Sequence, residues 1–261
     1  MGHATSPPRI DFNCDMGESF GAYRLGLDDQ IIRSVTSANI ACGFHAGDPA
    51  WMRRTVALAE QHGVGVGAHP GFPDLRGFGR RNLDLSPSDV RDDVLYQIGA
   101  LTAFTRDKRL QHVKPHGALY NMAVEHDALA SAICDAVVEA DPHAILVVLA
   151  GSRWVDLARR AGLRVGREVF ADRAFTAQGT LVPRSTPGSV IHDVNAVIER
   201  SLRLVTEGQV TAITGERVDL EADTICLHGD TPGSVQLAAA LREAFEGAGV
   251  ELVPLGRMLG A

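Results

Sequence analysis

Lysine is scarce in this 261-residue sequence, and several features that would point to a particular class of protein are missing. Only Lys108 and Lys114 are lysines among 25 basic Lys and Arg residues. The net charge is −7, so the chain lacks the basic surface typical of nucleic-acid binding. No apolar run approaches the roughly 18 residues of a membrane helix, and Met1 to Pro8 lack the apolar core of a signal peptide. We therefore expect neither nucleic acid nor a membrane as a partner.

The cysteines are few and scattered, and no C-x-x-C motif occurs. This pattern excludes a small disulfide scaffold and predicts reduced thiols in a cytoplasmic protein. Some of them flank the polar motifs described below, but cysteine is among the most buried residue types. Buried small side chains therefore explain them better than a cysteine nucleophile does. The cysteines are Cys14, Cys42, Cys134 and Cys226.

The two lysines lie in different settings. Arginine cannot lose its proton at usable pH, whereas lysine can, so a lysine kept in an arginine-rich chain can mark a position where arginine does not substitute. Lys108 belongs to the polar run Arg106-Asp107-Lys108-Arg109, which favours a solvated side chain. Lys114 follows a short apolar strand and precedes Pro115-His116-Gly117, which favours a functional role.

Short apolar runs alternate with helix signals along the whole chain, which predicts an α/β fold with a parallel sheet. Seven or eight such units in about 250 residues is the scale of a (β/α) barrel, and a doubly wound open sheet is the alternative. No linker or low-complexity segment divides the sequence, so one domain spanning residues 1–261 is expected. The expected strands are Ile10–Cys14, Ala38–Ala41, Gly63–Ala68, His112–Lys114, Ala144–Leu149, Arg164–Phe170, Thr224–Leu227 and Val250–Val253.

Helix starts are marked by a capping residue followed by proline, as at Asp48-Pro49, Ser86-Pro87 and Thr231-Pro232. Further helices are expected from Asp127 and from Ser152. The first helix should end near Glu60, and those that follow near Lys108, Glu139, Gly162 and Glu246. Two irregular stretches, Phe72–Leu85 and Asp172–Ser189, and an inserted hairpin, Val210–Leu220, interrupt the pattern. Glycines at 63, 65 and 67 lack the G-x-G-x-x-G spacing and favour a tightly closed barrel instead.

Polar residues follow nearly every expected strand. The carboxyl ends of parallel barrel strands meet at one mouth, where such enzymes place their chemistry. Four histidines at equivalent positions favour a functional site over structural histidines. The strand ends carry Asn13-Cys14-Asp15-Met16-Gly17-Glu18, Gly43-Phe44-His45-Ala46-Gly47-Asp48, His69-Pro70-Gly71, Lys114-Pro115-His116-Gly117, Glu168-Val169-Phe170-Ala171-Asp172-Arg173 and His228-Gly229-Asp230-Thr231-Pro232.

Three chemistries fit this set, and the residues leave all three open. Asp15, His45 and His69 form a candidate Asp/His/His metal site, although no H-x-x-x-H pair supports it. The carboxylates and histidines also suit metal-free general acid and base catalysis on water. Helix N-termini and the arginines of the irregular stretches suit phosphate binding. Those arginines are Arg80, Arg81, Arg173 and Arg184. A P-loop nucleotide site is excluded because no G-x-x-x-x-G-K-[ST] sequence occurs.

These motifs resemble those of the LamB/YcsF family, in the family's order from about residue 10 to 256 and with no motif broken. The resemblance implies an irregular seven-stranded (β/α) barrel of the type found in glycoside hydrolases and polysaccharide deacetylases. The segments that carry it are Asp11-Phe12-Asn13-Cys14-Asp15-Met16-Gly17-Glu18, Ala38-Asn39-Ile40-Ala41-Cys42-Gly43-Phe44-His45-Ala46-Gly47-Asp48, Gly67-Ala68-His69-Pro70-Gly71-Phe72-Pro73-Asp74, Gly77-Phe78-Gly79-Arg80-Arg81, Lys114-Pro115-His116-Gly117-Ala118-Leu119-Tyr120-Asn121, Phe170-Ala171-Asp172-Arg173 and His228-Gly229-Asp230-Thr231-Pro232.

The resemblance also implies a function: cleavage of 5-oxo-L-proline to L-glutamate, coupled to ATP hydrolysis, with two companion subunits, B and C. A five-membered lactam is a stable amide, and phosphorylation of its oxygen by ATP would activate it. A cation-rich mouth suits both phosphate and the substrate carboxylate. We expect His69 or His116 to be the base and Lys114 an electrostatic or proton-donating partner. The expected catalytic residues are Asp15, Glu18, His45, His69, Lys114, His116, Asp172, His228 and Asp230, and the expected ATP-binding residues are Arg80, Arg81 and Arg173.

Two other function classes stay open at this point. The first is a metal-dependent deacetylase or amidohydrolase, which would need a divalent ion and no nucleotide. The second is a non-catalytic subunit that binds the substrate and subunits B and C. The ordered cluster of ionisable residues argues against a purely structural role. ATP is thus the expected cofactor, and a divalent metal is left open.

Overall fold

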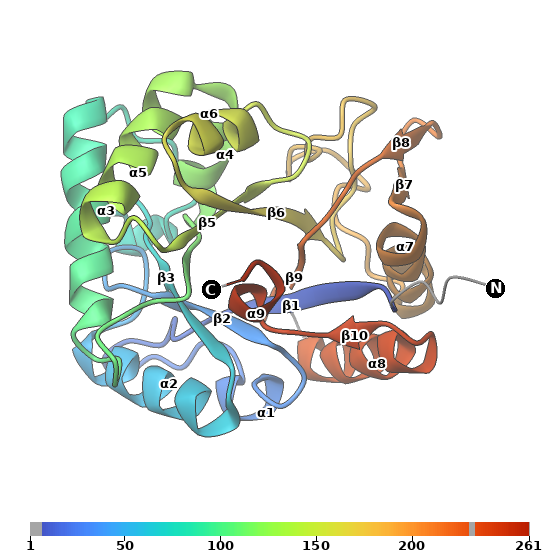
Figure 1. Ribbon diagram of the computed structural model, residues 1–261, viewed down its shortest axis with the longest axis horizontal. Coiled ribbons are helices and arrows are strands. Elements are labelled where there is room, and N and C mark those ends of the chain that lie inside the picture. Colours follow the sequence, from blue (N-terminus) through green and yellow to red (C-terminus); the bar gives the residue numbers. More distant parts are fainter. Residues whose placement is uncertain (1–6, 230–232, 261) are drawn as a thin grey trace.

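Parallel strands close into a barrel in the computed structural model, which describes residues 7–229 and 233–260. The sheet closes because β1 pairs with both β2 and β9, while β10 (Glu251–Leu252) adds to the amino end of β1 outside the ring. The predicted irregular seven-stranded (β/α) barrel is confirmed, and a doubly wound open sheet is excluded (Figure 1). The ring consists of β1 (Arg9–Met16), β2 (Ser37–Ala41), β3 (Gly65–His69), β4 (His112–Val113), β5 (Ile145–Leu149), β6 (Arg164–Phe170) and β9 (Thr224–Leu227).

Helices surround the barrel on its outer face (Figure 1). Each presents apolar side chains to the strands, and together they bury a continuous core that includes Phe12, Trp154 and Phe245. The longer helices are α2 (Pro49–His62), α3 (Pro87–Thr102), α4 (Gly117–Glu125), α5 (Asp127–Ala140), α6 (Trp154–Arg160), α7 (Val194–Glu207) and α8 (Ser234–Gly247). The shorter ones are α1 (Asp28–Ile31), α9 (Leu255–Met258) and the 3₁₀ helix η1 (Leu75–Gly77).

The helix starts follow the capping chemistry of the sequence. The Asp48 carboxylate accepts hydrogen bonds from the amides of Ala50 and Trp51, both at 2.9 Å, and Pro49 occupies the first turn of α2. Ser86 caps α3 in the same way through the amide of Asp89, at 3.1 Å. The predicted cap at Thr231 lies outside the described residues. Asp48 is therefore a structural cap, as the sequence indicated.

The connections contain the main differences from prediction. Helix α3 ends at Thr102, six residues before the expected end, and Lys108 has a positive φ of 54°. The ammonium of Lys108 donates to the carbonyls of Ala103 and Thr105, so this lysine closes the end of the helix rather than only facing water. Helices α4 and α7 were not anticipated. The predicted hairpin is confirmed by the antiparallel pair β7 (Gln209–Thr211) and β8 (Arg217–Asp219).

The amino end of the barrel is filled by polar side chains and closed by α9. The buried Asp11 carboxylate accepts hydrogen bonds from Ser37, Thr224 and the amide of Leu255 at the start of α9. Burial raises the pKa of Asp11 to about 6 against these hydrogen bonds. On the wall, Gly67 leaves room for the imidazole of His112, whose Nε2 would lie 2.1 Å from a Cβ at that position. The glycine-rich strand thus closes tightly, as predicted, because its missing side chains admit large neighbours.

Candidate active site

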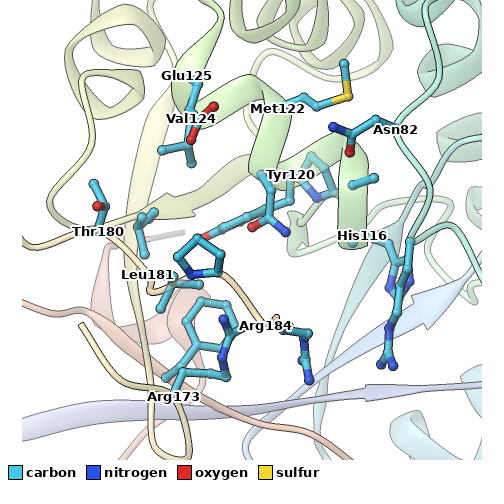
Figure 2. A pocket seen from close by; sticks show the side chains of 18 of the residues that line it. Asn82, His116, Tyr120, Met122, Val124, Glu125, Arg173, Thr180, Leu181 and Arg184 are labelled. Atoms are coloured by element: carbon cyan, nitrogen blue, oxygen red, sulfur yellow. The ribbon is translucent and has the colours of Figure 1, made fainter. Parts of the chain in front are cut away.

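A cavity of about 630 Å³ opens at the carboxyl ends of the barrel strands. Seven of the twelve residues predicted for the site line it: Asp15, His69, Arg80, Lys114, His116, Arg173 and His228. Figure 2 shows His116, Tyr120 and Asn82 on one flank, and Arg173 and Arg184 near the irregular stretch that also carries Thr180 and Leu181. The strand-end motifs therefore do converge on one mouth.

The remaining predicted residues lie in other places. Glu18 and His45 are buried beside the cavity wall, and Asp172 lies behind His228. The Arg81 side chain turns away to pair with the buried carboxylate of Asp74. Asp230 lies outside the described residues. The set thus divides into residues that face the cavity, residues that support them, and Arg81, which stabilises the Phe72–Leu85 loop.

Lys114 occupies the centre of the barrel, 2% exposed. Its ammonium lies 2.9 Å from Oδ1 of Asp15 and 3.0 Å from Oε1 of Glu168. Burial works against the charged form, but Asp15 and Glu168 raise the pKa of Lys114 well above its usual value. Burial likewise works against ionised Asp15, yet His69 and Lys114 hold the pKa of that carboxyl well below its usual range. Both groups are therefore charged, and Lys114 keeps Asp15 ionised at the cavity floor.

A chain of amides and a histidine fixes the orientation of Asp15. The amide of Asn39 donates to Oδ1 of Asp15 at 2.8 Å and to Oδ1 of Asn13 at 2.7 Å. Burial, followed by the charge of Lys114, lowers the pKa of His112 to about 3, so the ring is neutral. Its Nε2 lies 2.6 Å from Oδ1 of Asn39 and donates to that carbonyl. This network leaves Oδ2 of Asp15 directed at the neighbouring histidine, His69.

Backbone carbonyls fix which nitrogen carries the proton in two of the site histidines. Nδ1 of His69 lies 2.6 Å from the carbonyl oxygen of Lys114, and Nε2 of His116 lies 2.8 Å from that of Phe78, so both nitrogens donate. In two neutral rings the other nitrogens then present lone pairs. These nitrogens, Nε2 of His69 and Nδ1 of His116, face each other at 2.9 Å. Two lone pairs at this distance repel, so the geometry requires a cation between or beside them.

A proton or a metal ion can meet this requirement. Oδ2 of Asp15 lies 3.3 Å from Nε2 of His69, so this carboxylate stabilises positive charge at the point where the two nitrogens meet. A metal ion is the second solution, because Glu18, His45, His69 and His116 present ligand atoms that all lie within 4.8 Å of one another. This group keeps His45 and His69 of the expected Asp/His/His set but replaces Asp15 with Glu18 and His116. The residues present fit a divalent ion that favours nitrogen and carboxylate ligands.

His45 provides an independent observation on this cluster. Its ring is fully buried, and neither ring nitrogen has a hydrogen-bond partner among the described residues. It stacks on His116 with ring centroids 3.8 Å apart and planes inclined by 3°. Burial, followed by the neighbouring imidazoles of His116 and His69, lowers the pKa of His45 well below its usual value. A buried neutral imidazole with two unused nitrogens is unfavourable in a protein core unless a ligand engages it.

The Phe72–Leu85 loop holds this histidine stack in place. Phe78 adopts a left-handed conformation with φ of 55°, which points its carbonyl at His116. Gly79 follows with φ of 63°, and a Cβ there would lie 2.7 Å from Cβ of His45 and 2.8 Å from Cδ2 of His116. A strained non-glycine residue beside a functional cluster is a recurring feature of active sites. The loop is therefore part of the site.

A second chain of polar contacts reaches the cavity from the other flank. Nδ1 of His228 lies 3.0 Å from Oδ2 of Asp172, and Nη2 of Arg184 lies 2.8 Å from Nε2 of His228. A guanidinium only donates, so Nε2 of His228 accepts and Nδ1 carries the proton that Asp172 receives as a hydrogen bond. Burial opposes ionised Asp172, but His228 and Arg184 keep the pKa of its carboxyl below the usual value.

The cysteines do not carry nucleophile chemistry. Cys14, Cys42 and Cys226 are buried, and burial raises the pKa of each thiol, to about 12 for Cys42. A nucleophilic cysteine needs a lowered pKa and access to substrate. Structural burial, the interpretation favoured by the sequence, fits all three.

Glu168 and Tyr120 are site residues that the sequence analysis did not select. Glu168 lies within β6 and begins the polar motif at the end of that strand, which is a signal that could have identified it. Tyr120 lines the cavity, and burial, reinforced by Glu168, raises the pKa of its hydroxyl well above the usual value. The hydroxyl therefore stays protonated and can donate a hydrogen bond. Tyr120 belongs to the Lys114–Asn121 motif of the family resemblance, which is a signal that could have identified it, although its place in α4 was not predicted.

Comparison with known proteins identifies the family. Residues 10–260 match the model of the LamB/YcsF family. The chain belongs to this family. A LamB/YcsF relative from Syntrophobacter fumaroxidans, described as the A subunit of 5-oxoprolinase, is 56% identical over 250 residues, which covers 95% of this chain and 99% of the relative. A relative from Pyrococcus furiosus with the same description is 53% identical and covers 95% of this chain and 98% of its own.

Solved structures agree with this assignment. A lactam utilization protein from Thermus thermophilus superposes with a TM-score of 0.89 at 52% identity, over 94% of this chain and 99% of that chain. A peptidoglycan deacetylase from Bacillus subtilis superposes with a TM-score of 0.52 at 11% identity, over 97% and 90%. The second similarity concerns the fold alone. In this LamB/YcsF protein, none of the helices within residues 7–229 and 233–260 has the length and apolar character needed to cross a membrane.

Proposed function

We propose that this chain is the A subunit of an ATP-dependent 5-oxoprolinase, which hydrolyses the lactam of 5-oxo-L-proline to L-glutamate together with subunits B and C. The observation that carries the proposal is the cavity, where the Asp15–Lys114–His69–His116 cluster lies within reach of the same ligand as Arg173 and Arg184. Such a site combines acid and base groups for amide chemistry with cations for a carboxylate or phosphate. The descriptions of the relatives from Syntrophobacter fumaroxidans and Pyrococcus furiosus support the same activity.

The chemistry divides into activation and hydrolysis. ATP would transfer its terminal phosphoryl group to the lactam oxygen, with release of ADP. A first water molecule then adds to the carbonyl carbon of the lactam while His69 or His116 accepts its proton. Cleavage of the ring C–N bond then leaves γ-glutamyl phosphate, and a second water molecule hydrolyses this acyl phosphate to L-glutamate and phosphate. In this scheme Lys114 and Asp15 provide the fixed charges of the cavity floor, and Arg80 and Arg173, which line the cavity, hold phosphate.

A divalent ion in the histidine cluster is the alternative to this base chemistry, because His69 and His116 cannot accept a proton on the nitrogens that hold an ion. Glu18, His45, His69 and His116 would hold it, which would resolve the facing lone pairs and the unused nitrogens of His45. When bound, such an ion acts as a Lewis acid toward a carbonyl or a water molecule. Metal analysis of the purified chain by mass spectrometry tests this directly. We expect about one ion per chain in the wild type and none after His45→Ala and His116→Ala, whereas a metal-free wild type with full activity would reject the metal site.

The decisive experiment separates the subunits. Glutamate and ADP formation from 5-oxo-L-proline and ATP would be measured with A alone, with B and C alone, and with all three. We expect turnover only with all three, and about a hundredfold or greater loss when A carries Asp15→Asn. Full turnover by B and C without A would reject the proposal.

The histidine cluster also favours a second candidate function, a metal-dependent amidohydrolase that needs no nucleotide. Hydrolysis of an amide or lactam by A alone with an added divalent ion and no ATP would support it. A substrate-binding role without catalysis is distinguished by full turnover of the complex after His69→Ala and His116→Ala. The cytoplasm is the proposed location, because all four cysteines are free and buried.

A further inference from the structure

One flank of the cavity has a guanidinium whose position is fixed from behind. The chain of contacts from Asp172 through His228 to Arg184 begins at a carboxylate that is 6% exposed and ends at a residue that lines the cavity. The His228 ring is held in place by stacking on Phe170, with centroids 5.6 Å apart and planes inclined by 18°. A side chain ordered in this way loses little conformational entropy when a ligand binds.

The backbone that carries Arg184 is fixed as well. Arg173 donates from Nε to the carbonyl of Ser189 at 3.2 Å and from Nη2 to the carbonyl of Val182 at 2.6 Å. The Ser189 hydroxyl donates to the carbonyl of Arg184 at 3.1 Å. The buried Arg173 side chain thus ties together the two sides of the irregular stretch, with Arg184 between them. Two of its donor groups are used for this purpose.

Positive charge gathers on this flank. Burial, followed by the charges of Arg184 and Arg80, lowers the pKa of Arg173 to about 10. Arg173 is buried whereas Arg80 and Arg184 are exposed, and a buried cation beside two further guanidinium groups favours an anionic ligand. In Figure 2, Arg173 and Arg184 lie on the side of the pocket away from Met122, Val124 and Glu125. An anion bound here is therefore in the same cavity as the acid and base cluster but on a separate set of donors.

We propose that Arg184 binds the carboxylate of the substrate, and that Asp172 and His228 are positioning residues that aim its guanidinium. The inference rests on the proposed lactam hydrolysis and names the part of the substrate that this flank recognises. The carboxylate is the one charged group of 5-oxo-L-proline, and it distinguishes this substrate from uncharged lactams. Sites built to hydrogen-bond a substrate group reject analogues that lack it far more strongly than apolar pockets reject size changes. Arg184 thus sets specificity, whereas the reacting amide faces His69 and Lys114.

The test compares 5-oxo-L-proline with 2-pyrrolidinone, the same lactam without the carboxylate, in the full three-subunit complex. Arg184→Gln is expected to raise KM for 5-oxo-L-proline by about a hundredfold and to change kcat/KM for 2-pyrrolidinone by less than about threefold. Arg184→Lys, which keeps the charge but loses the planar fork, should recover part of the loss. Asp172→Asn should raise KM for 5-oxo-L-proline alone, by about tenfold. The matched control is Arg9→Gln, which removes an arginine paired with Glu251 at the opposite end of the barrel.

Calorimetry on the full chain provides a second readout. Wild-type protein should bind 5-oxo-L-proline more tightly than 2-pyrrolidinone, and Arg184→Gln should remove the difference while leaving ATP binding unchanged. Loss of ATP binding instead would identify a phosphate site and overturn the inference. If Arg184→Gln weakens the binding of both lactams equally, or of neither, the inference about Arg184 is also overturned. The proposed lactam hydrolysis would still stand. If the complex hydrolyses neither lactam but Arg184→Gln still abolishes binding of 5-oxo-L-proline, the carboxylate site stands and the proposed function fails.

Discussion

The ammonium of Lys114 lies 2.9 Å from the carboxylate of Asp15 and is almost fully closed off from solvent at the centre of the barrel. Glu168, which belongs to β6, approaches the same ammonium at 3.0 Å. One cation therefore holds two buried carboxylates, and each residue of this trio depends on the others. This arrangement makes the energetic role of Lys114 measurable.

Replacing Lys114 with Met should destabilise the protein by about 3–5 kcal/mol, because two buried carboxylates then lose their cation. Adding Glu168→Gln to the same chain should restore part of the loss, since one of those charges disappears. Urea unfolding of the wild type, the two single variants and the double variant gives a double-mutant cycle, which measures the interaction energy between Lys114 and Glu168. Strictly additive losses would mean that Lys114 and Glu168 do not share an electrostatic interaction.

Replacing Lys114 with Arg should lower turnover of the complex by about a hundredfold, or about 2.7 kcal/mol, because the larger guanidinium cannot occupy the same position between Asp15 and Glu168. Overpacking of the barrel centre should also cost stability, by about 1–3 kcal/mol. Steady-state assays and melting curves measure the two effects separately. Near-normal turnover would return Lys114 to a purely structural role.

Replacing Cys226 with Ala should leave turnover within about threefold of wild type, because its thiol is buried and its pKa is raised well above the usual value. The matched variant is Cys134→Ala, since Cys134 lies in α5 rather than in the barrel. Both should be slow to react with iodoacetamide in the folded protein. A thousandfold loss confined to Cys226→Ala would instead indicate a nucleophile.

Asp11 should make stability depend on pH. Its pKa is raised from 3.8 to about 6, so the folded protein binds a proton more readily than the unfolded chain between these values. The contribution of Asp11 to the free energy of unfolding is therefore greatest at low pH. It falls by about 3 kcal/mol in total as the pH rises through this window. Asp28, whose pKa burial also raises to about 6, adds to the slope, so urea unfolding from pH 4.5 to 8 should show a smaller fall in Asp11→Asn than in wild type. Parallel curves for the two proteins would contradict the prediction.

Gly79 and Gly162 form a matched pair for the histidine stack. Both have positive φ, 63° and 85°, but a Cβ at Gly79 meets His45 and His116 whereas one at Gly162 meets nothing within 4 Å. Gly162→Ala should cost about 1–2 kcal/mol of stability with normal turnover. Gly79→Ala should have the same backbone cost and, in addition, lower turnover at least tenfold by displacing the rings. Equal turnover in the two variants would show that the stack tolerates displacement.

Much of the barrel could be predicted because its signals are local. The strands Arg164–Phe170 and Thr224–Leu227 have the predicted bounds, and the second of them is a short apolar run between polar segments. The starts of α2 and α3 follow from Asp48-Pro49 and Ser86-Pro87 for the same reason. Helix α4 was missed because it begins at a glycine, Gly117, with φ of 55°, within a motif that otherwise indicates a loop.

The membership of the site could be predicted more fully than its internal arrangement. Strand order places His69 and His116 at one mouth, and this requires only that the sheet be parallel. The proton positions in these rings depend on carbonyls of Lys114 and Phe78, which a sequence pattern does not locate. The direction of Arg81 similarly depends on a loop conformation set by Asp74. Spacing thus predicts which residues meet, and tertiary contacts decide what each of them does.

The pairing of β1 with β9 has a consequence for the synthesis of this protein. Across this pairing the side chain of Asn13 donates a hydrogen bond to Thr224, 211 positions further along the chain. At synthesis rates of about 5–20 residues per second, roughly 10–40 s separate the appearance of these two residues. Throughout that interval one edge of β1 has no partner strand, and exposed strand edges attract other chains. The open edge of β1 is therefore exposed while the chain is still on the ribosome. It is covered only when β9, the last strand of the ring, has been synthesised.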